Sequence, residues 1–106
     1  LDYVNTHMTE NISVRDIADA LNVSQSYLSH AFKKSTGYGL WNYVISKRLV
    51  YAQKLLVEGI SVTEACYESG FKDYAHFIKS FTKTFGCSPK QYGKEEPSSY
   101  MVKLYL

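Results

Sequence analysis

The sequence predicts an all-α protein in which two helix-turn-helix subdomains are joined by a long linker helix. Residues 12–16, Ile-Ser-Val-Arg-Asp, return as residues 60–64, Ile-Ser-Val-Thr-Glu, at an offset of 48. Residues 32–37 return as residues 81–86 at an offset of 49. Between and around these repeats the apolar residues recur at helical spacing. An internal repeat of this period indicates one supersecondary unit used twice.

The first helix-turn-helix is expected over about residues 13–36. Ser13 and Asp16 have the spacing of a capping box, which marks the start of a helix. Asn22 to Ser24 should form a tight turn, because Asn tolerates the left-handed conformation and Ser24 can cap the next helix. The expected buried stripe of the leading helix contains Val14, Ile17, Ala18 and Leu21.

The second helix of this unit, about residues 24–35, carries two different faces. Leu28, Ala31 and Phe32 form an apolar stripe that should be buried. In the other stripe every side chain can donate a hydrogen bond. Its members are Ser26, Ser29, His30 and Lys33. A helix of this kind suits insertion into a groove of nucleic acid.

The linker helix is expected over about residues 40–57, after Gly37 and Gly39 end the preceding helix. Its length of roughly 27 Å makes it a strut between the two copies. Arg48 lies on its apolar side, so we expect a structural pairing with a carboxylate of a leading helix. The expected buried side contains Trp41, Val44, Ile45, Leu49, Ala52, Leu55 and Leu56.

The second helix-turn-helix is expected over about residues 61–85, with its second helix at about 73–84 and one extra residue near Lys72 in the turn. Phe77, Ser80 and Phe81 take the buried stripe. The face that corresponds to the donor stripe of the first copy contains Ala75, Ile78, Lys79 and Thr82. Ser88 and Pro89 should begin a short closing helix. We assign residues 1–94 to one domain and residues 95–106 to a C-terminal tail.

Charge placement indicates a polyanionic partner, although the net charge is only +2. Residues 24–57 contain five basic residues and no acidic one, and residues 70–94 contain five lysines against Asp73 alone. The acidic residues gather on or beside the leading helices. Two such second helices on one face of double-stranded DNA would be about 34 Å apart. Expected phosphate contacts are Ser24, Gln25, Lys33, Lys34, Lys72 and Lys83.

Other classes of function find little support. Cys66 and Cys87 lack metal-ligand spacing, so we expect reduced buried thiols in a cytoplasmic protein, with no metal and no cofactor. No run of apolar residues is long enough to predict a membrane span. Cys66 with His76 is the one conceivable nucleophile pair, and Cys66 lies on a buried stripe, so we do not expect an enzyme.

The main alternative is a peptide-binding module of tandem helix pairs. Leu1 in place of Met suggests a piece of a longer chain.

Residues 3–94 resemble the DNA-binding domain of AraC/XylS-type bacterial transcription regulators. The first half of the resemblance rests on Ile17-Ala18, Tyr27-Leu28, Phe32-Lys33-Lys34, Gly37, Tyr43, Arg48, Ala52 and Leu55-Leu56. The second half rests on Gly70-Phe71, Phe77, Phe81, Lys83, Gly86, Pro89 and Tyr92. This resemblance implies about seven helices. It also implies an effector-sensing or receiver domain upstream, and RNA polymerase as a further partner of an activator or repressor.

The resemblance also implies which residues contact bases. They are Ser26, Ser29 and His30 in the first copy and Tyr74, Ala75, Ile78 and Lys79 in the second. Ala75 and Ile78 weaken hydrogen-bond recognition by the second copy. They would either touch thymine methyl groups or leave this helix to grip the DNA backbone. His30 is expected to contact a base or a phosphate, with an ordinary exposed histidine as the alternative.

Overall fold

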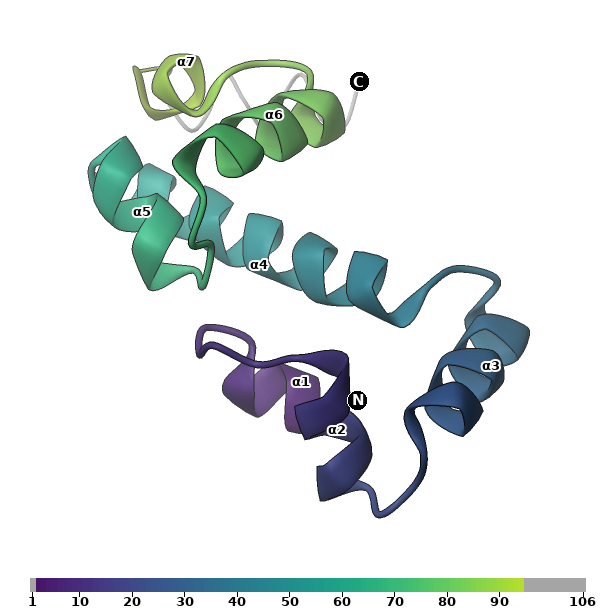
Figure 1. Cartoon of the computed structure of the whole chain (residues 1–106). Helices are drawn as coiled ribbons and strands as arrows, with labels where there is room; N and C mark the ends of the chain where they lie inside the picture. The colour runs from purple at the N-terminus through teal and green to yellow at the C-terminus, as the bar shows by residue number, and fades with distance from the viewer. Residues whose placement is uncertain (1, 95–106) are drawn as a thin grey trace. The chain divides into compact units, whose positions relative to one another are not determined.

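The computed structural model describes residues 2–94, which form seven α-helices and no strand (Figure 1). The predicted all-α class is therefore confirmed for this part of the chain. The chain divides into two compact units, residues 1–48 and residues 49–106. Each unit has its own core. The expected tail, residues 95–106, lies outside the described residues.

The first unit contains α1 (Asp2–His7), α2 (Val14–Ala20), α3 (Gln25–Thr36) and the first part of α4 (Leu40–Val57). The predicted capping box forms at the start of α2. Asp16 N–H donates to Ser13 Oγ at 3.2 Å, and Ser13 N–H donates to Asp16 Oδ2 at 2.8 Å. The buried core of this unit contains Val4, Ile12, Ile17, Ala18, Leu28, Leu40 and Val44.

Two predictions about this core are wrong. Leu21 is 44% exposed, because α2 ends at Ala20 and Leu21 caps the helix instead of continuing its buried stripe. Trp41 is 37% exposed. Its ring lies under the Arg48 guanidinium, whose carbon is 5.3 Å from the ring centroid, so the indole packs against a cation rather than inside the core.

Arg48 has the predicted structural role, but its expected carboxylate partner is wrong. The buried side chain donates from Nε to the carbonyl of Met8 at 2.6 Å and from Nη2 to the carbonyl of Glu10 at 3.0 Å. These carbonyls belong to the loop between α1 and α2, so one guanidinium holds that loop to α4. Burial lowers the pKa of Arg48 from its ordinary value.

The turn between α2 and α3 has the predicted left-handed residue. Asn22 has a φ of +57°, and the N–H of Val23 donates back to the carbonyl of Ala18 at 3.0 Å. Figure 1 shows the chain reversing here before α3 begins. Ser24 then caps α3, accepting a hydrogen bond at Oγ from the N–H of Tyr27 at 3.1 Å. This short turn fixes where the first residues of α3 lie relative to α2.

The second unit contains the rest of α4, then α5 (Val62–Glu68), α6 (Tyr74–Phe85) and α7 (Pro89–Lys94). It repeats the turn with Gly70 in the left-handed conformation at φ +102°, while Phe71 N–H donates to the Cys66 carbonyl at 3.1 Å. Asp73 caps α6 by accepting from the N–H of His76 at 3.1 Å.

Caps of the second unit follow the sequence pattern with one exception. Ser61 Oγ accepts from the N–H of Glu64 at 3.2 Å, but among the described residues the reciprocal bond from the Ser61 N–H to the Glu64 carboxylate is not made. The cap of α5 therefore makes only half of the capping box that the repeated sequence forms at α2. At α7, Ser88 and Gln91 cap the helix reciprocally, with Pro89 as its first residue, as predicted.

Aromatic side chains build the core of the second unit. Ring centroids lie 5.1 Å apart between Phe71 and Phe77, 5.8 Å between Phe77 and Phe81, and 5.6 Å between Phe81 and Tyr92. These residues come from the turn, α6 and α7. The aromatic series therefore fixes the buried side of α6 and, with it, the side that faces outward.

Candidate nucleic-acid interface

Helix α3 presents the predicted donor stripe to solvent. Its members are all exposed: Ser26, Ser29, His30 and Lys33, with Lys34 beside them. The opposite side of the helix carries buried Leu28 and half-buried Phe32. The apolar residues thus hold the helix in place while the hydrogen-bond donors remain available to a partner.

A hollow of about 480 Å³ lies on this outer face. Ser29, His30, Lys33 and Lys34 line it. One hydroxyl, one imidazole and two ammonium groups therefore border the same space. Such a set matches groups that accept hydrogen bonds and carry negative charge, such as phosphate oxygens and the acceptor atoms of base edges.

The lysine side chains of α3 and α6 differ from the charged side chains of the preceding helices in their partners. Among residues 2–94, Arg15 pairs with Asp19 at 3.9 Å and His7 hydrogen-bonds with Glu10 at 2.7 Å. Neither involves a lysine of α3 or α6. The lysine charges on these helices are therefore not neutralised by an ion pair within the described part of the chain, and they are available to a polyanion.

The outer face of α6 has a different chemistry. Tyr74, Ala75 and Lys79 are exposed, while Ile78 is half-buried. Thr82, which occupies the position of Lys33, donates its hydroxyl proton to the carbonyl of Ile78 at 2.8 Å. This helix therefore offers fewer free donors than α3, and its cap, Asp73, places a carboxylate where Ser24 has a hydroxyl.

The residues predicted to contact phosphates are exposed in both units. In the first unit, the predicted base contacts share one exposed face with the lysines predicted for phosphate. In the second, Lys72 and Lys83 are exposed, before and within α6 respectively. The oxygen of Ser24 accepts a helix N–H, which leaves its O–H available as a donor. Gln25 is exposed at the first position of α3.

Histidines outside the donor stripe pack against aromatic rings. His7 is half-buried, with its ring centroid 4.4 Å from that of Tyr3. His76 is exposed and makes an edge contact with Phe71 at 5.8 Å.

Sequence reasoning missed Tyr27 as a candidate contact residue. It is 65% exposed and lies on α3 next to the donor stripe. A signal was available, because Tyr27 falls seven residues before Lys34, about two helical turns, and therefore on the same edge of the helix.

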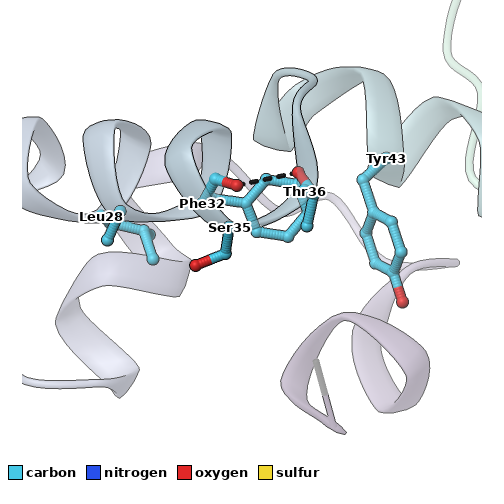
Figure 2. Close-up of a pocket in the computed structure, with 6 residues that line it drawn as sticks. Leu28, Phe32, Ser35, Thr36 and Tyr43 are labelled. Atoms are coloured by element: carbon cyan, nitrogen blue, oxygen red, sulfur yellow. Dashed lines mark hydrogen bonds between the residues drawn. The ribbon is translucent and has the colours of Figure 1, made fainter.

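A second hollow, of about 390 Å³, lies on the core side of α3 (Figure 2). Phe32 and Tyr43 border it with ring centroids 5.4 Å apart. The Thr36 hydroxyl, also at its edge, donates to the carbonyl of Phe32 at 2.8 Å. Since this lining continues the apolar stripe of α3, the hollow belongs to the packing side of the helix and not to the donor stripe.

Neither a metal centre nor a membrane span emerges from the described residues. Between residues 2 and 94, no three His, Cys, Asp or Glu side chains converge in a way that would hold a metal ion. Over the same residues, every helix is too short or too polar to cross a bilayer.

The comparisons with known proteins agree with this geometry. A protein family described as "Helix-turn-helix domain" matches residues 17–95. The Msm operon regulatory protein of Streptococcus mutans is 36% identical over 93 residues, which cover 87% of this chain and 34% of that protein. The lactose operon transcription activator of Staphylococcus xylosus is 32% identical over 93 residues, covering 87% of this chain and 33% of that protein.

A solved structure gives the same result. The crystal structure of a probable AraC family transcriptional regulator from Rhodopseudomonas palustris has a TM-score of 0.79 and 25% identity, covering 88% of this chain and 89% of that chain. The chain therefore belongs to the helix-turn-helix family. Within this class it is an AraC-type DNA-binding domain, as its sequence suggested. It spans about a third of the length of the two curated relatives.

Proposed function

We propose that this domain binds double-stranded DNA sequence-specifically, as the DNA-binding part of a longer bacterial transcription regulator. The observation that carries the proposal is the outer face of α3. Exposed hydroxyl, imidazole and ammonium donors gather there around one hollow, and no acidic side chain occurs in the helix. A helix with these donors fits the major groove, where every base pair presents a distinct set of acceptors and donors.

Roles follow from position on the two helices. Base contacts are proposed for Ser26, Ser29 and His30 of α3 and for Tyr74, Ala75, Ile78 and Lys79 of α6. Phosphate contacts are proposed for Ser24, Gln25, Lys33, Lys34, Lys72 and Lys83. The two sets act differently, because base contacts give specificity while phosphate contacts give affinity and orientation.

The wider role is drawn from the relatives. Their names refer to operon regulation and transcription activation, so we propose that the full-length protein regulates transcription in the bacterial cytoplasm with RNA polymerase as a further partner. Because both relatives are about three times as long, an upstream effector-sensing or receiver domain is proposed as the part that receives the signal.

The direct test is selection of bound sites from a random duplex library, followed by affinity measurements at two salt concentrations. A DNA-binding domain enriches defined sequences and loses affinity steeply with salt, with a log-log slope of about −0.9 per phosphate contact. Absence of enrichment together with a flat slope would contradict the proposal and favour a peptide-binding module.

His30 provides the sharpest residue-level test of specificity. Replacing His30 by Ala should cost about 1 to 3 kcal/mol on the selected duplex and relax the preference at one base pair. His7→Ala is the matched control, because His7 lies on α1 and outside the proposed interface. An equal loss on every duplex would assign His30 to a phosphate instead.

A further inference from the structure

The side chain of Tyr27 is exposed and has no packing role among the described residues. Tyr27 has the largest exposed fraction, 65%, among the large hydrophobic side chains of the described residues. No described residue makes a hydrogen bond or ring contact with its side chain. Its backbone N–H donates to Ser24 Oγ in the cap of α3, which leaves the phenol outside the cap.

The internal repeat supplies a control for this position. At the offset of 49, the residue equivalent to Tyr27 is His76, whose ring packs against Phe71 at 5.8 Å. At the offset of 48 that holds before the turn, the first unit has Val23 where the second has Phe71, and the ring contact of the second copy has no counterpart among the described residues. Both residues are exposed, but His76 contacts an aromatic ring whereas Tyr27 makes no ring contact with any described residue.

Helix geometry places Tyr27 on the same edge of α3 as Lys34, which is a proposed phosphate contact. Tyr27 and Lys34 lie about two turns apart on the same edge of α3, while Ser26 and His30 lie nearer the middle of its outer face. A helix about 10–12 Å across nearly fills a major groove about 12 Å wide, so its edges meet the phosphate backbones.

We propose that Tyr27 is a further DNA-contacting residue. Its phenolic O–H donates a hydrogen bond to a phosphate oxygen of the DNA backbone that Lys34 also faces. The proposal rests on the proposed function of the domain. It assigns affinity, and not base preference, to Tyr27, because a phosphate carries no sequence information. It also predicts an unusual salt signature, since a neutral hydroxyl displaces no counterion whereas the Lys34 ammonium does.

The test compares Tyr27→Phe, which removes only the hydroxyl, with Lys34→Met and with Tyr67→Phe. Tyr67 is a matched control, because it is 51% exposed on α5, outside the proposed interface. Tyr27→Phe should lower affinity about tenfold for the selected duplex and for an unrelated duplex alike, with an unchanged salt slope. Lys34→Met should reduce the magnitude of the slope by about 0.9, and Tyr67→Phe should bind like the wild type.

A phosphate scan then locates the contact. Single methylphosphonate substitutions in the selected duplex should reveal one position that weakens the wild type but causes no further loss in Tyr27→Phe. Unchanged affinity of Tyr27→Phe, or a loss confined to one base sequence, would overturn the assignment. If the wild type enriches no duplex, the proposed function itself fails, and this is known before any variant is made.

Discussion

At the scale of single residues, Arg48 shows how a buried cation is accommodated without a carboxylate. Two backbone carbonyls accept its hydrogen bonds, and the Trp41 ring lies under the guanidinium. The Glu10 carbonyl also accepts from the N–H of Ile12 at 2.9 Å, so the bond to Met8 is the one whose loss leaves a carbonyl unpaired. Such charge-dipole bonds offset the cost of taking the guanidinium out of water.

Replacing Arg48 by Met should therefore destabilise the domain by about 1 to 3 kcal/mol, measured by urea unfolding. Arg48→Lys should recover part of this, because one ammonium can reach one carbonyl but lacks the fork of the guanidinium. The salt slope of DNA binding should not change in either variant. Wild-type stability in Arg48→Met, or a reduced slope, would contradict the structural role.

Cys66 is a second buried residue with a measurable signature. Burial, followed by a contribution from the charge of Asp73, raises the pKa of its thiol to about 11. The unfolded chain releases this proton at lower pH than the folded chain does. The stabilisation from Cys66 is thus present below the unfolded pKa, about 8.5 to 9, and is lost as the pH rises through the folded pKa.

The expected result is a Tm difference that depends on pH. Wild type should lose more stability than Cys66→Ala between pH 8 and about pH 10.5, so the gap between their melting temperatures should narrow. Burial also raises the pKa of Tyr92. Because Tyr92 is present in both proteins, its contribution to the pH dependence cancels in the comparison. A constant gap across this range would show that the thiol is not protected as described.

At the scale of elements, the two turns solve one problem with different residues. Asn22 and Gly70 both adopt the left-handed conformation that closes the leading helix. Asn22→Ala should cost about 1 to 2 kcal/mol in thermal unfolding, because a β-carbon without a local hydrogen-bonding group is disfavoured there. Asn22→Gly should stay close to the wild type. Equal stability of the Ala and Gly variants would mean that the turn relaxes to another geometry.

These local elements are what the sequence predicts well. Caps such as Ser13 with Asp16, and the left-handed turn at Asn22, depend on residues within a few positions of each other. The partners of Arg48 depend instead on where a loop some forty residues earlier lies in space. Helical periodicity does not contain that information.

The candidate site can likewise be predicted from the sequence only in its local features. Periodicity places Ser26, Ser29 and His30 on one outer face, and the structure shows them exposed there. Periodicity alone does not separate Tyr27 from the packing residues at the edge of the apolar stripe. Its 65% exposure is a property of the folded unit.

At the scale of the whole molecule, the two duplicated subdomains expose different side chains, which favours different modes of DNA contact by α3 and α6. The donor face of α3 suits hydrogen-bond recognition of bases. Ala75 and Ile78 of α6 offer apolar contact, for which the thymine methyl group is the matching partner in the major groove. If both helices contact bases, site selection should return two short motifs about one helical turn apart, the second rich in thymine.

Thymine-to-deoxyuracil replacement decides between base contact and backbone grip by α6. The motif insensitive to His30→Ala is the one assigned to α6. Removing the methyl groups of that motif should weaken wild-type binding about fourfold per contacted methyl, while Ile78→Ala should already lack this contribution and respond less. The same replacement in the other motif provides the control for altered duplex stability. A single enriched motif with a steep salt slope, unaffected by deoxyuracil, would instead mean that α6 holds only phosphates, and that specificity resides in α3 alone.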